Sequence, residues 1–484
     1  MTAVPGTSRC AWRGEFASDH SLAVVNDGLV GAVEQLGVAV ERIPVESPAL
    51  ATDAVGVAAH WPPVWEAPTA GPFAIYQPWE FGEIPALWAE RIRERVDEVW
   101  TASEYSRQSY LAAGLAPELV HVVPNGVDLD RFSPDGSAHP LERRAGTVFL
   151  FVGGTTYRKG IDVLLSAYRA AFDADDDVLL VVKGFGSGTW YRGQTAESFI
   201  DELRADPDAP ALLSLDEHLD YDAIPALYRA ADVVVQPYRG EGFCLPALEA
   251  LACGKPLIAT AGGPTDEFAS DACAWRLPSS RIALPPGALP GEMKPAGGGF
   301  LLEPELEGLV DALRAAADPD ARAAKAATAR AHAERYSWPA AAAIVADRLA
   351  ALDGRTPIGR TAPAVIPGAR QVVLAVDADW ERPETWTPAL AAYAGAFGPD
   401  DDTTLVLPAS DEAAAVAAIG SFLETSDIDA DRLADVVVAD SSGLATGALE
   451  LTADAFVCAG PTRPLRARRV LAPEPAALRS LLVP

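Results

Sequence analysis

The amino-acid sequence predicts an α/β protein made of three successive α/β parts, the last of them shorter than the others. Short apolar segments bounded by turn residues alternate with helical patterns over most of the 484 residues. This alternation is typical of parallel sheets covered by helices. Apolar residues make up 49% of the chain, which is enough for several packed cores.

The first part, 1–146, has the pattern of a single parallel sheet. A helical pattern over 21–37 ends at a glycine and leads directly into an apolar strand. The strands expected in this part are 38–43, 54–59, 73–76, 98–101 and 119–123.

The second part, 147–353, repeats the alternation and ends in a long helical stretch. Its expected strands are 147–152, 178–182, 232–236 and 256–260, and its expected helices are 162–172 and 246–252. The Ala- and Arg-rich run 308–354 is also predicted to be helical. Residues 354–370 hold three glycines and three prolines and are predicted to be a linker.

The third part, 371–484, is predicted to be a shortened copy of the second. The helical segment 165–172, with its acidic loop and apolar strand, recurs as 390–397 with the same two features after it. The segment 231–235 recurs as 434–438 in the same order. Two matches in the same order favour a duplicated, truncated α/β unit.

Composition narrows the function classes. The formal net charge of −30 argues against nucleic acid and anionic membrane surfaces as partners, because both attract clustered Lys and Arg. No apolar run reaches the length of about 18 residues that spans a bilayer, so any membrane contact is expected to be at most peripheral. The five cysteines are scattered, and residues 1–13 have no signal-peptide pattern, so a reduced, cytoplasmic location is expected.

The strongest candidate site is the segment 240–250, which follows a buried strand and opens a helix. Pro246 suits the first helical turn and Gly254 suits the position after the helix end. A helix N-terminus beside a glycine-flanked loop favours phosphate. Glu241 lies on the loop, and Glu249 lies among apolar helix residues, where a buried carboxylate requires hydroxyl or amide partners. The alternative is that Glu249 points to water on a surface helix.

A second candidate lies between the strand 147–152 and the following helix. It begins with Gly153 and Gly154 and contains Arg158 and Lys159, two cations that could clamp a diphosphate at the carboxyl edge of the sheet. Lys183, at the end of the next strand, is a further candidate for the same phosphates. The alternative is a solvated basic turn.

Other polar residues follow strands of the first and third parts. His60 could contact a sugar or be a structural hydrogen-bonding residue. Trp79 and Glu80 could shape an acceptor pocket, or they could be a packing tryptophan and a surface carboxylate. The pair Asp377 and Asp379 resembles a metal-binding carboxylate pair of another transferase architecture, but the repeat explains this strand better.

Together these segments resemble the retaining glycosyltransferases of group 1, or family 4, which have the GT-B fold of two Rossmann-like domains facing across a cleft. The resemblance is carried by 123–128, 153–160 and 231–235, and by Glu241 and Glu249 with seven residues between them. It covers about residues 10–350. Many members carry an arginine where this chain has Gly154, and Arg158 is expected to substitute for it.

The resemblance assigns roles to residues of this chain. Glu241 would bind sugar hydroxyls, Glu249 would bind the ribose hydroxyls, and His60 would lie near the sugar. The residues expected to bind the donor are Gly153, Gly154, Arg158, Lys159, Lys183, Gly242, Phe243, Leu245 and Glu249, and those expected to border the base are Glu217, His218 and Leu219.

The implied function is transfer of a sugar from a nucleotide-diphosphate sugar to a glycan, a lipid-linked or a small-molecule acceptor, with retention of configuration. No cofactor and no obligatory metal are expected, because cations and a helix terminus would stabilise the leaving diphosphate. The third part lacks the paired glutamates and is predicted to be non-catalytic. Two alternatives are a nucleotide-sugar epimerase and a non-enzymatic nucleotide-sugar-binding or assembly protein.

Overall fold

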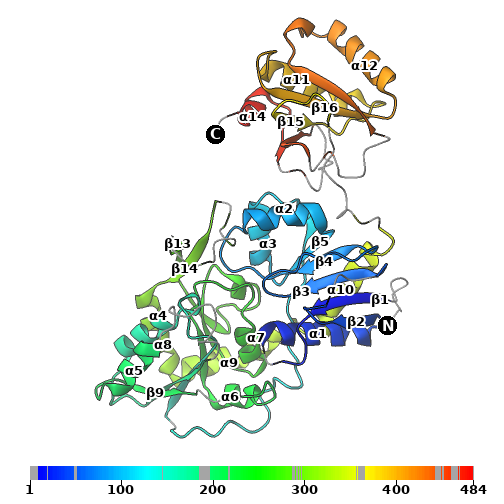
Figure 1. The fold of residues 1–484 in the computed structure, drawn as a ribbon. Coiled ribbons are helices and arrows are strands. Elements are labelled where there is room, and N and C mark those ends of the chain that lie inside the picture. Colours follow the sequence, from blue (N-terminus) through cyan, green and yellow to red (C-terminus); the bar gives the residue numbers. More distant parts are fainter. Residues whose placement is uncertain are drawn as a thin grey trace. The chain divides into compact units, whose positions relative to one another are not determined.

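The computed structural model describes most of the chain, and contacts divide it into two units. The described residues are 9–18, 20–47, 52–143, 145–184, 197–215, 219–285, 289, 293, 295, 297–355, 357, 366–441, 449, 452–458, 467 and 469–482. Unit 1 comprises Met1–Ala86, Trp100–Tyr110 and His121–Arg355, and unit 2 comprises Leu87–Val99, Leu111–Val120 and Thr356–Pro484. Figure 1 shows the helices and strands in sequence order.

The first sheet has six strands in the order β2-β1-β3-β4-β5-β6. Strand β1 pairs in parallel with β2 and β3, and β3 pairs in parallel with β4. The strands are β1 (Arg9–Gly14), β2 (Ala39–Ile43), β3 (Val55–Ala59), β4 (Phe73–Tyr76), β5 (Glu98–Thr101) and β6 (Val120–Val122), and the helices are α1 (Ser21–Gln35), α2 (Ala86–Arg95) and α3 (Glu104–Ala112). The five predicted strands are present, and β1 was not predicted.

The second sheet, in unit 1, has the order β12-β11-β10-β7-β8-β9 with every neighbouring pair parallel. Its strands are β7 (Thr147–Val152), β8 (Val178–Lys183), β9 (Ala211–Ser214), β10 (Val233–Gln236), β11 (Leu257–Thr260) and β12 (Ala274–Leu277). Its helices are α4 (Ile161–Ala171), α5 (Glu197–Ala205), α6 (Ile224–Ala230), α7 (Leu245–Ala252), α8 (Leu306–Ala317) and α9 (Pro319–Ala333).

Both faces of the second sheet are buried. Successive strand side chains alternate between the faces, so Phe149 and Phe151 join a core with α4 and α8. Leu150 and Val152 join the opposite core with α7 and α9. A strand buried on both sides is therefore a continuous apolar run, which is why β7, β8, β10 and β11 were predictable. The less buried β9 and β12 were not predicted.

The predicted helical stretch 308–354 is helical and is formed by α8, α9 and α10 (Trp338–Leu352). Helix α9 begins after Asp318 and α10 begins after Ser337, and in each case the side chain of that residue accepts backbone N–H groups of the first turn. Helix α10 packs on α1, where Gly28 lies against the Trp338 ring. The chain thus returns to the first sheet after completing the second.

An unpredicted hairpin of β13 (Ser279–Ala283) and β14 (Phe300–Pro304) follows β12. It contacts the segment after β4, because Gly82 forms an antiparallel bridge with Gly299. The Glu83 carboxylate also accepts the Gly298 N–H at 2.8 Å. The hairpin therefore holds residues 81–83 beside the second sheet.

The third sheet, in unit 2, has the order β17-β16-β15-β18-β19 with every neighbouring pair parallel. Its strands are β15 (Val372–Ala375), β16 (Thr403–Ala409), β17 (Asp435–Asp440), β18 (Ala455–Val457) and β19 (Val470–Leu471), and its helices include α11 (Thr387–Ala396), α12 (Glu412–Thr425) and α14 (Pro475–Arg479). Among the described residues, no helix combines the length and apolarity needed to cross a bilayer.

The first of the two repeated segments occupies the same place in both sheets. Tyr168 of α4 donates a hydrogen bond to the carbonyl of Ala211, the first residue of β9, at 2.8 Å. Tyr393 of α11 donates to the carbonyl of Asp435, the first residue of β17, at 3.0 Å. The units β7-α4-β8 and β15-α11-β16 therefore correspond, and β9 corresponds to β17.

The predicted match of 231–235 with 434–438 is wrong. The Asp232 carboxylate, just before β10, accepts the N–H of the second residue of β7 at 2.8 Å. The Asp454 carboxylate, just before β18, accepts the N–H of the second residue of β15 at 2.8 Å. The counterpart of β10 is thus β18. An alanine, an aspartate and three valines are common at the start of a buried parallel strand, so this short match carried little information.

Candidate functional site

Helix α7 and the loop before it lie at the carboxyl end of β10. The helix begins after Cys244, which has a left-handed backbone with φ of 73°. Pro246 lies in the first turn, where a missing N–H costs no intrahelical hydrogen bond. The Gly254 N–H bonds to the Leu251 carbonyl and closes the helix, as predicted.

Gly240 and Gly242 allow this loop to approach the segment after β4 closely. A Cβ on Gly240 would lie 2.7 Å from the Glu80 carbonyl oxygen, and a Cβ on Gly242 would lie 3.1 Å from the Pro78 Cβ. The Ser103 hydroxyl also donates to the Gly242 carbonyl at 2.6 Å. The loop that carries Glu241 is thus packed against the carboxyl edge of the first sheet.

Four charged side chains meet at this contact. Lys159 donates a hydrogen bond to Glu241 Oε1, and Arg158 Nη1 lies 3.6 Å from Glu241 Oε2. Arg158 Nη1 also lies 3.8 Å from Glu80 Oε1 and donates to the Gly240 carbonyl at 2.6 Å. The cluster therefore holds two cations and two carboxylates, one of them from the first sheet. The side chains are 8–15% exposed, so solvent screens them little.

A buried arginine that sequence reasoning missed supports this cluster. Arg239 forms bidentate pairs with Asp162 and with Glu303, with N–O distances of 2.6–2.9 Å. Its guanidinium also lies 3.7 Å from the centre of the Tyr157 ring. These contacts fix the short helix Tyr157–Lys159 that presents Arg158 and Lys159. The only available sequence signal was its position directly before Gly240.

Glu249 points into the protein, and 5% of the residue is exposed. Its Oε1 accepts the Tyr221 hydroxyl and its Oε2 accepts the Tyr228 hydroxyl, both at 2.8 Å. Burial raises the pKa of the Glu249 carboxyl, while the hydrogen bonds from Tyr228 and Tyr221 oppose the rise. Each carboxylate oxygen can accept about two hydrogen bonds, so acceptor capacity remains for a ligand.

The other predicted donor-side residues lie at the ends of β7 and β8 and at the start of α7. Lys183 ends β8, is buried, and accepts the Gly153 N–H on its own carbonyl at 3.1 Å. The Phe243 ring packs against Phe268 in an aromatic core, and Leu245 is half-buried at the start of α7.

The predicted base-side residues are only partly visible. Leu219 is half-buried and packs against the core shared by the two sheets of unit 1. Glu217 and His218 lie outside the described residues.

His60 lies at the end of β3. Its Nδ1 is 2.9 Å from the Pro62 carbonyl oxygen, and its Nε2 is 3.4 Å from Glu15 Oε1. The structure therefore pairs His60 with first-sheet residues, whereas Glu80, which follows the neighbouring strand, reaches the Glu241 cluster.

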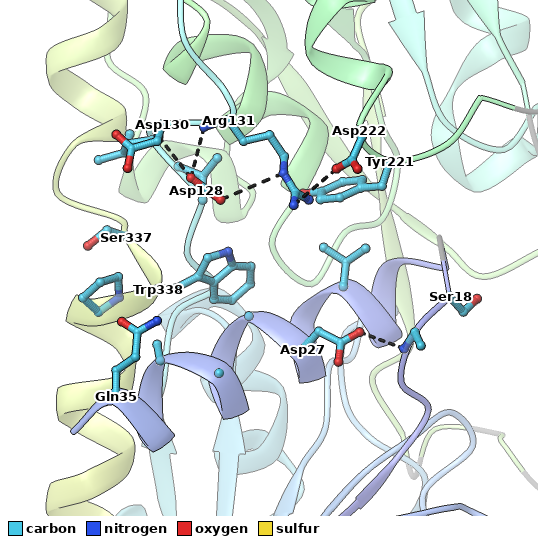
Figure 2. A pocket seen from close by; sticks show the side chains of 18 of the residues that line it. Ser18, Asp27, Gln35, Asp128, Asp130, Arg131, Tyr221, Asp222, Ser337 and Trp338 are labelled. Carbon is cyan, nitrogen blue, oxygen red and sulfur yellow. Dashed lines mark hydrogen bonds and ion pairs between the residues drawn. The ribbon is translucent and has the colours of Figure 1, made fainter. Parts of the chain in front are cut away.

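A cavity of about 940 Å³ lies beside Glu249 in unit 1. Figure 2 shows α1 with Asp27 on one side and Asp128, Arg131 and Tyr221 on the other. The Arg131 guanidinium lies over the Tyr221 ring, 5.2 Å from its centre. Because Tyr221 lines the cavity and also donates to Glu249, it connects the two. The residues that line the cavity are Ala17, Ser18, Val24, Asp27, Gly28, Gly31, Ala32, Gln35, Val127, Asp128, Leu129, Asp130, Arg131, Asp220, Tyr221, Asp222, Ser337, Trp338 and Pro339.

The two α/β sheets and the charged cluster at their edges are those of a glycosyltransferase, and comparison with known families supports this class. Residues 138–275, which carry both cations and both glutamates, match the model of the family described as glycosyl transferases group 1. The resemblance predicted from the motifs is confirmed, and this segment is a group 1 glycosyl transferase segment.

Two curated relatives illustrate the similarity. D-inositol 3-phosphate glycosyltransferase of Geodermatophilus obscurus is 36% identical over 248 residues, covering 47% of this chain and 54% of that protein. The protein of the same name from Xylanimonas cellulosilytica is 32% identical over 248 residues, covering 49% of this chain and 52% of that protein. The chain spans about half the length of these relatives.

Solved structures agree on the fold. Sucrose-phosphate synthase from Thermosynechococcus elongatus aligns with a TM-score of 0.52 and 16% identity, over 70% of this chain and 98% of that chain. A glycosyltransferase from Rickettsia africae aligns with a TM-score of 0.51 and 14% identity, over 72% of this chain and 98% of that chain. The predicted fold class, a GT-B pair of Rossmann-like parts with an additional α/β part, is confirmed.

Proposed function

We propose that the protein is a glycosyltransferase that transfers a sugar from a nucleotide-diphosphate sugar to a hydroxyl acceptor. The observation that carries this proposal is the arrangement of Glu241, Lys159 and Arg158 at the carboxyl edge of the second sheet, with Glu249 buried in the helix that begins there. Open α/β sheets bind ligands at this edge, and the segment is the part that matches the family.

Each charged group has a separate task in this proposal. Arg158 and Lys159 neutralise the donor diphosphate, with Lys183 as a further cation at the end of β8. Glu241 accepts hydrogen bonds from sugar hydroxyls, and Glu249, held by its two tyrosines, accepts them from the ribose. The backbone at Gly242, Phe243 and Leu245 adds the partial positive charge of the α7 N-terminus.

The cavity beside Tyr221 is the proposed place of the nucleoside. It is large enough for a base and ribose, since small-molecule sites commonly measure about 300–1,000 Å³. Leu219 precedes its Asp220–Asp222 wall, which fits the base-side role expected for that segment. The acceptor is proposed to approach from the first sheet, near His60 and Glu80.

We further propose that transfer retains the anomeric configuration and needs no metal. The cations Arg158 and Lys159 already supply the charge that would stabilise a leaving diphosphate. The acceptor hydroxyl would then attack from the side on which the diphosphate departs, with a phosphate oxygen as its base.

A ligand panel followed by product analysis tests the proposal. Thermal unfolding is measured with UDP, GDP and ADP and with their sugars, and the sugar nucleotide that raises the melting temperature is the donor. UDP-glucose and D-inositol 3-phosphate are the first donor and acceptor to try, since a solved structural neighbour holds the former and relatives carry the latter in their name.

The products then distinguish the alternatives. NMR of the product gives its anomeric configuration, and the same reaction with EDTA tests the metal. An inverted product would contradict retention, and isomerisation of the donor without an acceptor would indicate an epimerase. No binding of any sugar nucleotide would overturn the proposed function.

A further inference from the structure

The carboxylate of Glu80 lies beside Arg158, a residue proposed to bind the donor diphosphate. Glu80 follows β4 in a segment whose Trp79 is fully buried, and the Trp79 carbonyl accepts the Ser106 hydroxyl at 2.9 Å. The Glu80 backbone is in turn packed against Gly240. The segment is thus fixed, and its carboxylate reaches Arg158 on the second sheet, with Oε1 at 3.8 Å from Nη1.

The two cations of the cluster already face carboxylates, and Lys183 at the end of β8 is the further cation proposed for the diphosphate. Arg158 and Lys159 face Glu241 and Glu80, so two positive charges meet two negative ones. A nucleotide diphosphate adds further negative charge, which would be repelled at short range unless a carboxylate left. Glu241 has a new role available on donor binding, because sugar hydroxyls can replace Lys159 as its partners.

Glu80, unlike Glu241, has no sugar hydroxyl in the proposed donor site to replace its cation as a partner. Its Oε2 is buried and makes no hydrogen bond within the described part of the chain. The Glu80 Oε1 lies 3.8 Å from Arg158 Nη1, which is longer than a hydrogen bond, so the pair is weaker than a hydrogen-bonded one. A diphosphate, which offers several oxygens, can therefore displace it.

We propose that Glu80 is a donor-competing residue, which neutralises Arg158 while the site is empty and yields it to the diphosphate when a nucleotide binds. The inference rests on the proposed function, since it assumes that Arg158 contacts the donor diphosphate. It makes Glu80 a positioning residue for Arg158 and a determinant of donor affinity, contributed by the first sheet to a site on the second.

The surroundings of Glu80 make this competition pH-dependent. Among the residues that the structure describes, Arg158, Lys159, Glu241 and Tyr110 are ionisable groups that face it. Burial raises the pKa of the Glu80 carboxyl; Arg158 and Lys159 oppose the rise and Glu241 adds to it. As pH falls through this raised pKa, Glu80 becomes neutral and releases Arg158, so its competition with a diphosphate ends.

The test compares nucleoside diphosphate binding to three forms of the full-length protein. Calorimetric titration with UDP, GDP and ADP is carried out on the wild type, on Glu80→Gln and on Glu83→Gln, between about pH 5.5 and about pH 8. At the upper pH, Glu80→Gln should bind the accepted diphosphate about three- to tenfold more tightly, because one competing charge is gone. The gain should shrink as pH falls, since a growing fraction of the wild-type carboxyl is then neutral.

Glu83→Gln is the matched control. It lies three residues along the same segment, loses the same charge from a strongly acidic chain, and contacts the Gly298 N–H rather than a cation. It should bind the diphosphate as the wild type does. A gain of equal size in this control would mean that long-range charge, and not Glu80, sets the affinity, and would overturn the inference.

Unchanged or weaker binding by Glu80→Gln at every pH would also overturn the inference. If that variant does not fold by circular dichroism, Glu80→Asp takes its place, because the shorter side chain withdraws the carboxylate from Arg158. It should bind the diphosphate more tightly than wild type by a smaller factor. Failure of the wild type to bind any nucleoside diphosphate would instead contradict the proposed function itself.

Discussion

The second and third sheets have one scaffold and two different sets of strand-end residues. The parallel order β11-β10-β7-β8-β9 corresponds strand by strand to β19-β18-β15-β16-β17. Val152 ends β7 at the place of Asp377, and Gly154 stands at the place of Asp379. The second sheet presents Arg158 and Lys159 after this point, whereas Asp379 bonds to Arg382 of its own turn at 2.7 Å.

The difference separates what builds the fold from what builds the site. The tyrosine on the first helix and the aspartate before the central strand keep the same backbone partners in both sheets. Residues 458–468, which follow β18 in the sequence, include three arginines and no acidic residue. Scaffold contacts are thus retained while the proposed donor ligands are missing, which fits a non-catalytic copy.

The largest expected effect is loss of turnover in Glu241→Ala. The change removes the carboxylate proposed to hold the sugar, so kcat should fall by at least about 100-fold, while nucleoside diphosphate binding is retained or tightened because Lys159 loses a competing carboxylate. Initial rates with the accepted donor check this. Asp379→Ala at the third sheet should leave kcat unchanged, and an equal loss there would break the distinction between the two sheets.

A smaller effect is expected for Lys159→Ala. A charge-assisted hydrogen bond contributes about 1.5–3 kcal/mol, so Kd for the nucleoside diphosphate should rise about 10- to 100-fold. Calorimetric titration measures it. If Lys183→Ala weakened binding and Lys159→Ala did not, the phosphate site would lie at the end of β8 instead.

Tyr221→Phe is expected to act through the ionisation of Glu249. Losing one hydroxyl donor leaves the buried carboxylate less stabilised, so its already raised pKa rises further. Donor affinity should fall as pH falls through that pKa, and in the variant this fall should begin at a higher pH. The profile of KM for the donor against pH tests this, with an increase of about three- to tenfold at neutral pH. An unshifted profile would show that Tyr221 only packs.

The smallest expected effect is a loss of stability when the corresponding tyrosines of the second and third sheets lose their hydroxyl groups. Tyr168→Phe removes the hydrogen bond to Ala211, and Tyr393→Phe removes those with Thr403 and Asp435, so each should lower the free energy of unfolding of its own unit by about 0.5–1.5 kcal/mol per hydrogen bond lost. Urea unfolding followed by tryptophan fluorescence measures both. A cost confined to one variant would mean that the two tyrosines are not equivalent.

The sequence predicted most strands because burial on both faces makes them continuously apolar. The unpredicted strands include β9, β12 and β14. Two further unpredicted strands have polar residues: β1 contains Arg9 and Arg13, and β13 begins with two serines and an arginine. Arg13 is nonetheless buried, and its guanidinium lies 3.6 Å from Glu66. That contact lies far along the chain, so no local pattern could reveal the strand.

The residues of the candidate site also fall into those that the sequence predicted and those that it did not. Residues 153–160 and 240–250 were found because each motif is contiguous. The hydroxyl partners of Glu249 come from 21 and 28 residues earlier, and Glu80 comes from another sheet. These residues have no fixed spacing from the motifs, and their contribution depends on tertiary packing. Only the contacts in the folded chain identify them.

The close approach at Gly240 and Gly242 has a consequence for altering this protein by design. One side of the loop carries Glu241, while the other side is in van der Waals contact with first-sheet backbone and Pro78. In a saturation library, any side chain at these two glycines would clash with the segment after β4 and push it away from the loop. Enzyme engineers seeking a new donor preference should therefore randomise the cavity wall around Tyr221 and leave this loop intact.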